Sequence, residues 1–140
     1  MGVILDSSIL IAGERRRDSV WEVLQRVEAV CGATAAALSA VTVVELTHGI
    51  YRAKSDADRE RREAFCEELY QAVAVHPLTL EIARLAGRIH GEQMARGTGI
   101  DFPDLIIGTT AFLSCNSNRA IGQQDRRDYK AGRKCLGGCE

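Results

Sequence analysis

Three carboxylates in this sequence stand where they could act together on one ligand. Asp6 directly follows a short apolar run, Glu45 lies in an apolar helical pattern, and Asp104 follows a proline at a helix start. Clustered carboxylates repel one another, and proteins usually offset that cost with a hard divalent cation such as Mg²⁺ or Mn²⁺. Such an ion typically serves phosphoryl transfer or hydrolysis. Acids at helix N-termini also act as caps and dipole partners, so spacing alone leaves metal binding and capping equally open.

The elements that would position these acids alternate between strands and helices. Compact apolar runs predict buried strands at residues 3–5, 35–40 and 73–75. Apolar residues at helical spacing predict helices near residues 20–27, 41–53, 56–71, 79–94 and 103–113. This alternation is typical of an α/β fold with a parallel sheet, in which ligands bind beyond the carboxyl ends of the strands. We therefore expect Asp6 at that edge, with Glu45 and Asp104 in the first turns of helices that begin there.

Length and charge limit the classes of protein that need to be considered. The chain has 140 residues, and 18 Lys and Arg against 19 Asp and Glu give a net charge of −1. We expect a single soluble domain without a polybasic nucleic-acid arm, although a local basic face is compatible with this total. The sequence shows neither a signal peptide nor an apolar stretch long enough to span a bilayer, so no membrane partner is expected.

The cysteines favour a reducing compartment. Their number is odd and no two of them form a C-x-x-C pair, which suits free thiols in the cytoplasm better than a secreted disulfide framework. The five are Cys31, Cys66, Cys115, Cys135 and Cys139.

The three acids stand in the segments VILDSSILIA around Asp6, LSAVTVVELTHGI around Glu45 and GIDFPDLIIGTTAFL around Asp104. In their order and approximate separations, these segments resemble the PIN-domain nucleases, and among them the VapC-type ribonuclease toxins of prokaryotic toxin–antitoxin pairs. Together they cover the chain to about Leu113. The resemblance implies a three-layer α/β/α PIN-like fold with a central parallel sheet, built as one domain over residues 1–140. Residues 118–140 match this pattern weakly.

The resemblance also implies roles for particular residues. Asp6 and Asp104 match the principal ligands of Mg²⁺ (or Mn²⁺), Glu45 matches a third, and Ser8 matches a small polar position that supports Asp6. In IGQQDRRDY, Asp125 falls at a fourth acidic position, with Gln123 where the family usually has a hydroxyl. Asp128 is the less favoured substitute for Asp125. Asp101 competes with Asp104, but it stands where a turn or N-cap residue belongs.

An active member of this family would cleave RNA phosphodiester bonds with a metal-activated water. Its expected partners are the RNA substrate, a VapB-type antitoxin and a second copy of itself in a homodimer. The alternative is a PIN-like fold that no longer cuts and serves as an RNA-binding or protein-interaction module.

Two further sets of residues have both a functional and an ordinary interpretation. Five arginines could hold the RNA backbone, although charged runs more often form solvated faces. They are Arg15, Arg16, Arg17, Arg126 and Arg127. His48 lies three residues after Glu45 and raises the alternative of metal-free acid–base catalysis, but His76 and His90 are far from it in sequence.

Overall fold

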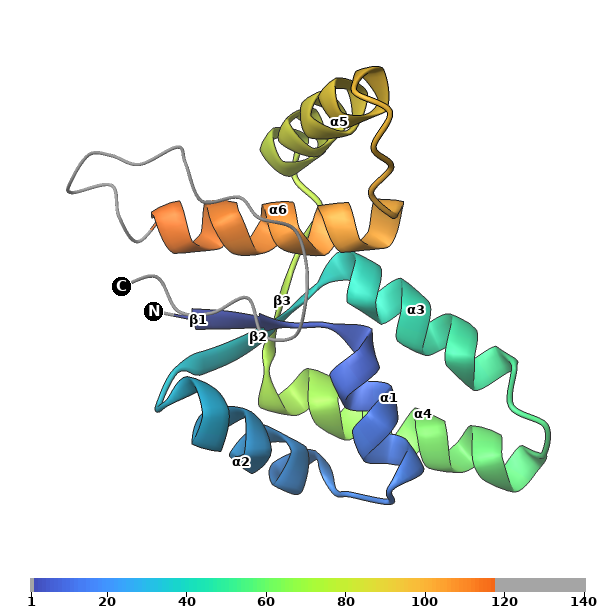
Figure 1. The fold of residues 1–140 in the computed structure, drawn as a ribbon. Helices are drawn as coiled ribbons and strands as arrows, with labels where there is room; N and C mark the ends of the chain where they lie inside the picture. Colours follow the sequence, from blue (N-terminus) through green and yellow to red (C-terminus); the bar gives the residue numbers. More distant parts are fainter. Residues whose placement is uncertain (1, 118–140) are drawn as a thin grey trace.

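The computed structural model describes residues 2–117, and these form three strands and six helices. Figure 1 shows the sheet between two layers of helices. In chain order the elements are β1 (Gly2–Leu5), α1 (Ser7–Arg15), α2 (Val20–Cys31), β2 (Ala35–Ser39), α3 (Ala40–Tyr51), α4 (Asp56–Ala72), β3 (Ala74–His76), α5 (Leu80–Ala95) and α6 (Phe102–Ser117).

The three described strands form a parallel sheet in the order β1-β2-β3. Leu5 pairs with Leu38 at the end of β1, and Ser39 pairs with His76 one residue beyond. The carboxyl ends of all three strands therefore lie at one edge of the sheet. Asp6 follows β1 at this edge, and α3 begins there directly after β2.

Successive side chains along the strands point to opposite faces of the sheet, and a separate hydrophobic core lies on each face. Leu5 belongs to a large core that β1 and β2 share with α1, α2, α3 and α4. Ile4, its neighbour in β1, points to the opposite face and packs with Ile107 and Ala111 of α6. Since successive strand residues face opposite sides, both faces of this sheet need a cover of helices. The expected three-layer α/β/α arrangement is confirmed.

Helix α5 lies outside this arrangement and packs against α6 (Figure 1). Its buried residues Ile82 and Ala86 meet Leu105 and Ile106 of α6. The side chain of Thr79 caps the N-terminus of α5 by accepting a hydrogen bond from the Ile82 N–H at 3.2 Å.

Helix α1 was missed by the sequence analysis, which places no helix between Asp6 and Asp18. Its buried residues are Ser7, Leu10, Gly13 and Glu14. Leu10 is the only large apolar residue among these four, so the buried side of the helix gives almost no hydrophobic periodicity. The burial of the other three is explained by tertiary contacts rather than by their own hydrophobicity.

Other predicted boundaries differ by a residue or so. Strand β3 begins at Ala74 rather than Val73, because Val73 is the C-cap of α4. Helix α3 begins at Ala40, which the sequence assigns to the preceding strand. This places Glu45 in the second turn of α3, and the expectation that it stands in the first turn is wrong. The apolar pair Ala120-Ile121, which gives a weak sequence indication of one more strand, lies outside the described residues.

No helix within residues 2–117 has both the length and the apolar character needed to cross a membrane.

Candidate active site

Asp6 stands at the N-cap position of α1, yet its side chain makes no capping hydrogen bond. Its carboxylate accepts hydrogen bonds from two hydroxyl groups instead, from Ser8 at 2.7 Å and from Ser7 at 3.4 Å. These serines come from the first turn of α1 and restrict the orientation of the carboxylate. The capping interpretation therefore fails for Asp6, whose oxygens are held beyond the end of β1.

Asp104 lies in the first turn of α6, and this helix packs against β1. Asp104 is exposed, but neighbouring atoms partly desolvate its carboxylate and raise its pKa, and the negative charges of Asp6 and Asp101 raise this pKa further. A charge effect between Asp6 and Asp104 requires that they lie close together, although most of the described chain separates them in sequence. Asp101 precedes the helix, and its carbonyl accepts a hydrogen bond from the Leu105 N–H at 3.0 Å. That is the N-cap position expected for Asp101.

Glu45 points from α3 with one oxygen, Oε2, buried and without a hydrogen-bond partner among the described residues. Leaving a buried acceptor unsatisfied costs about 1–3 kcal/mol, and charged groups cost more. Such an atom in a native structure is typical of a place where a ligand, ion or water completes the bonding. The Glu45 Oε2 atom is therefore a candidate contact for a partner that is not among residues 2–117.

A buried hydroxyl ties α3 to the end of β1. The Thr42 side chain, which is fully buried, donates a hydrogen bond to the Leu5 carbonyl at 3.3 Å. Leu5 directly precedes Asp6, and Thr42 lies one turn before Glu45. The Ser39 hydroxyl caps the same helix by accepting from the Val41 N–H at 3.3 Å. Neither Thr42 nor Ser39 was singled out from the sequence, because no local pattern marks a contact between α3 and β1.

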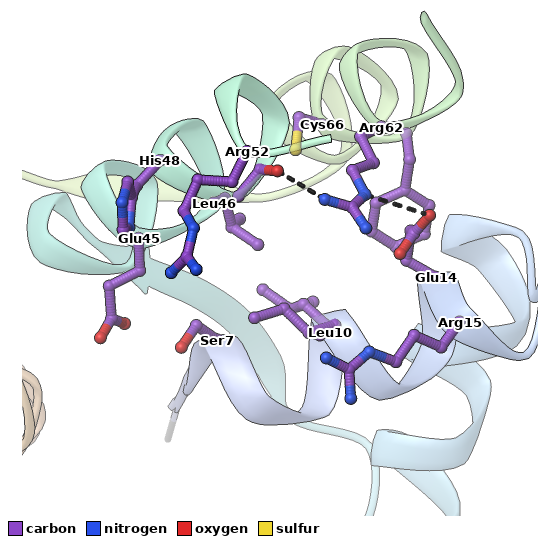
Figure 2. Close-up of a pocket in the computed structure, with 13 residues that line it drawn as sticks. Ser7, Leu10, Glu14, Arg15, Glu45, Leu46, His48, Arg52, Arg62 and Cys66 are labelled. Carbon is purple, nitrogen blue, oxygen red and sulfur yellow. Dashed lines mark hydrogen bonds and ion pairs between the residues drawn. The ribbon is translucent and has the colours of Figure 1, made fainter. Parts of the chain in front are cut away.

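A pocket of about 460 Å³ opens beside these residues, between α1, α3 and α4. Figure 2 shows Ser7 and Glu45 on one side of it and Glu14 with Arg62 on the other. The lining residues are Ser7, Leu10, Ile11, Glu14, Arg15, Glu45, Leu46, His48, Gly49, Arg52, Arg62, Phe65 and Cys66. The pocket thus has an apolar interior with charged residues around it.

Ion pairs close the side of the pocket opposite Glu45. Glu14, which is 9% exposed, accepts hydrogen bonds from Arg61 Nε at 3.1 Å and Nη2 at 2.8 Å. Arg62 lies 3.8 Å from the same carboxylate and donates a hydrogen bond to the Gly49 carbonyl at 2.5 Å. These contacts join α1, α3 and α4 and leave the guanidinium groups of Arg61 and Arg62 engaged within the fold.

A protein-family model described as the PIN domain matches residues 3–127, which is most of the chain. This chain belongs to the PIN domain family. A comparison with curated proteins finds no match.

Solved structures share the fold of this PIN domain. VapBC2 from Rickettsia felis bound to a promoter DNA fragment is 17% identical, with a TM-score of 0.67 over 81% of this chain and 82% of that one. FitAcB from Neisseria gonorrhoeae is 20% identical, with a TM-score of 0.65 over 81% and 82%. VapBC-5 from Mycobacterium tuberculosis is 24% identical, with a TM-score of 0.62 over 81% and 79%.

The chemistry of the donors in this PIN domain suits a hard cation. Asp6, Asp104 and Glu45 offer carboxylate oxygens, which Mg²⁺ and Mn²⁺ prefer. The unpartnered oxygen of Glu45 and the repulsion between Asp6 and Asp104 both fit a bound cation. Within residues 2–117, however, no three acidic, histidine or cysteine side chains are close enough together to enclose an ion. Asp125, Gln123 and Asp128 lie outside the described residues.

The histidines do not gather at the site. His48 lies beside Glu45 in the wall of the pocket (Figure 2). His76 ends β3, and His90 makes an edge contact with Phe102, with ring centroids 6.3 Å apart. Among the described residues, His48 has no second histidine at the pocket with which to form an acid–base pair.

Proposed function

We propose that this PIN domain is a Mg²⁺- or Mn²⁺-dependent endoribonuclease of the VapC type, the toxin of a toxin–antitoxin pair. The observation that carries the proposal is the approach of Asp6, which follows β1, to Asp104 in the first turn of α6, which packs against β1. Desolvation and then the negative charge of Asp6 raise the pKa of Asp104. Two like charges held together without an internal cation are costly, and a bound divalent ion would offset that cost.

In this proposal Asp6 and Asp104 hold the ion and Glu45 contributes a third oxygen. Ser8 keeps the Asp6 carboxylate oriented through its 2.7 Å hydrogen bond. Asp125 is proposed as the fourth acid, on the strength of its sequence position alone. When bound, the ion would supply water activation near neutral pH and neutralise charge that develops on the phosphate.

The proposed partners follow from the neighbours in fold. The solved structures named above include VapBC assemblies, and the Mycobacterium tuberculosis one is described as a member of a family of toxin–antitoxin systems. We propose a VapB-type antitoxin as the regulatory partner, RNA as the substrate and a homodimer as the assembly, acting in the cytoplasm.

Cleavage of a mixed RNA panel by the purified protein tests the activity. We expect cutting with Mg²⁺ or Mn²⁺, none with EDTA, and loss of at least a hundredfold in rate for Asp6→Ala or Asp104→Ala, on the order of one lost catalytic group. The matched control is Asp56→Asn, which removes an exposed carboxylate from the first turn of α4. Equal rates for Asp6→Ala and the wild type would refute the proposal.

The second candidate is the PIN-like module that binds RNA or protein without cutting. It is favoured by the absence, within residues 2–117, of three ligand side chains close enough to enclose an ion. Thermal unfolding with and without Mg²⁺ separates the two. A metal ligand set stabilises the fold by about 1.4 kcal/mol when Mg²⁺ is at ten times its Kd. A folded protein that shows neither this stabilisation nor cleavage would be the binding module.

A further inference from the structure

Two arginines that line the pocket have no acidic partner among the residues that the structure describes. Arg15 and Arg52 form no ion pair and no side-chain hydrogen bond within residues 2–117, and both are exposed. Arg62, across the same pocket, is engaged by Glu14 and the Gly49 carbonyl, and Arg61, which precedes it in the same helix, pairs with Glu14. Among the arginines that line the pocket, Arg15 and Arg52 are therefore the two that have no acidic partner within residues 2–117.

These arginines come from different elements and line the same space. Arg15 is the last residue of α1, and Arg52 is the C-cap of α3. In Figure 2 Arg52 extends from α3 toward Ser7, and Arg15 runs back along α1 beside Leu10. Both side chains therefore line the pocket, Arg52 on the side of Ser7 and Glu45 and Arg15 beside Leu10.

Positive and negative groups thus lie near one another without neutralising each other. Glu45 lines the same pocket as Arg52, yet its buried Oε2 atom has no hydrogen-bond partner in the described part of the chain. A ligand that brings both a cation and an anion would satisfy both sets, the cation at the carboxylates and the anion at the arginines. A nucleic-acid phosphate accompanied by a divalent ion has this combination of charges.

We infer that Arg15 and Arg52 form a phosphate-binding subsite, which holds a phosphate of the RNA strand next to the one that is cleaved. This rests on the proposed ribonuclease function and identifies positioning residues for it. The pocket that the arginines line also contacts the core residues Leu10, Leu46 and Phe65, which are almost fully buried. The pocket volume of about 460 Å³ falls in the range of roughly 300–1,000 Å³ typical of pockets for small ligands.

A structural explanation competes with this inference. Both arginines stand at helix C-termini, where a cation is favourable toward the helix dipole. Arg96 provides a matched control, because it is the C-cap of α5 and is also exposed, without an ion pair in the described residues, but it lies away from the pocket. A dipole role predicts the same consequences for all three arginines, whereas a phosphate subsite predicts a difference.

Binding of a short fluorescent single-stranded RNA, measured in EDTA over a series of salt concentrations, tests the inference without requiring cleavage. The proteins are the wild type, Arg15→Gln, Arg52→Gln, the double variant and Arg96→Gln. We expect each pocket substitution to weaken binding about three- to tenfold and to reduce the magnitude of the salt slope by about 0.7, the value for one phosphate contact on a single strand. Arg96→Gln should bind as the wild type does, and Arg52→Lys should retain most of the slope because its charge remains.

Three results would overturn the subsite. The first is a double variant whose RNA binding has the same salt slope as the wild type, when the wild type itself cleaves RNA. That result would remove the subsite and leave the proposed ribonuclease function standing. The second is an equal loss in Arg96→Gln. The third is an unchanged RNA slope together with lost binding of a labelled poly-glutamate peptide, which would assign the arginines to a protein partner. Cleavage kinetics give an independent readout, since a positioning role raises KM more than it lowers kcat.

Discussion

The carboxylates of the site show how one residue can differ from another of the same type through its surroundings. Asp6 is held by two serine hydroxyls, while the exposed Asp104 carboxylate is partly desolvated and feels the negative charges of Asp6 and Asp101. The pKa of Asp104 is raised by desolvation and then by the charges of Asp6 and Asp101. In the metal-free protein this environment disfavours the ionised form of Asp104, which lowers the free energy of unfolding when Asp104 is charged. A bound cation would offset that loss.

This difference leads to a prediction about pH. Because the folded pKa of Asp104 lies above its unfolded value, the folded state binds more protons, and stability falls as pH rises from the unfolded pKa through the folded one. Asp104→Asn cannot ionise and escapes this loss. In EDTA we expect the Tm of Asp104→Asn, relative to the wild type, to rise across that window and to stay higher at neutral pH. Parallel curves of Tm against pH for the two proteins would contradict the prediction.

At the scale of the elements, the close packing of α1 against α2 determines where α1 places the serines that hydrogen-bond to Asp6. Gly13 in α1 is buried, and a methyl group added there would collide with the stiff side chain of Val23 in α2. The absence of a side chain at Gly13 is what permits this close approach. Helix α1 carries Ser7 and Ser8, so the packing of α1 against α2 also positions the hydroxyl groups that hydrogen-bond to Asp6.

Two glycine substitutions test this packing. Alanine is favoured over glycine in a helix interior by about 1 kcal/mol. Gly87→Ala in α5 meets open space and should gain that stability. Gly13→Ala should instead destabilise the fold by about 1–3 kcal/mol, as expected for overpacking. Urea unfolding measures both, and a stabilised Gly13→Ala protein would show that Val23 moves aside at little cost.

At the scale of the whole molecule, the two sides of the sheet are attached differently. The sheet, α1, α2, α3 and α4 share one large core, whereas α5 packs chiefly on α6 among the described elements. A helix that is held by one interface unfolds locally at a lower free-energy cost than elements that share a large core. The carboxylate edge is built from the sheet, α1, α3 and α6, so it does not depend on α5 directly.

Hydrogen exchange tests this difference. Amides of α5 should exchange faster than those of β1 and β2, and Ile82→Ala should weaken the protection of α5 while leaving β1 unchanged. Ile82 is 6% exposed and belongs to the core between α5 and α6. Equal loss of protection in α5 and β1 would mean that the described chain opens as a single unit.

The sequence by itself determined the strands, most of the helices and the positions of Asp6 and Asp104 within them. These features depend on neighbours a few residues away, such as the apolar run before Asp6 and the proline before Asp104, so a local pattern carries them. The capping box of Ser19 and Glu22 at the start of α2 is of the same kind. The order of motifs also indicated the PIN domain, which the family comparison shows.

Only the tertiary structure decided the existence of α1, the partners of the site residues and the pocket. Besides Leu10, α1 buries Ser7, Gly13 and Glu14. Gly13 lies against Val23 of α2 and Glu14 pairs with Arg61 of α4, so their burial depends on other helices rather than on local hydrophobicity. Within residues 2–117, the unpartnered Oε2 atom of Glu45 and the unpaired charges of Arg15 and Arg52 likewise depend on what other elements place beside them. Contacts between residues far apart in sequence leave no periodic trace in the chain, and for that reason the pocket could not be predicted from it.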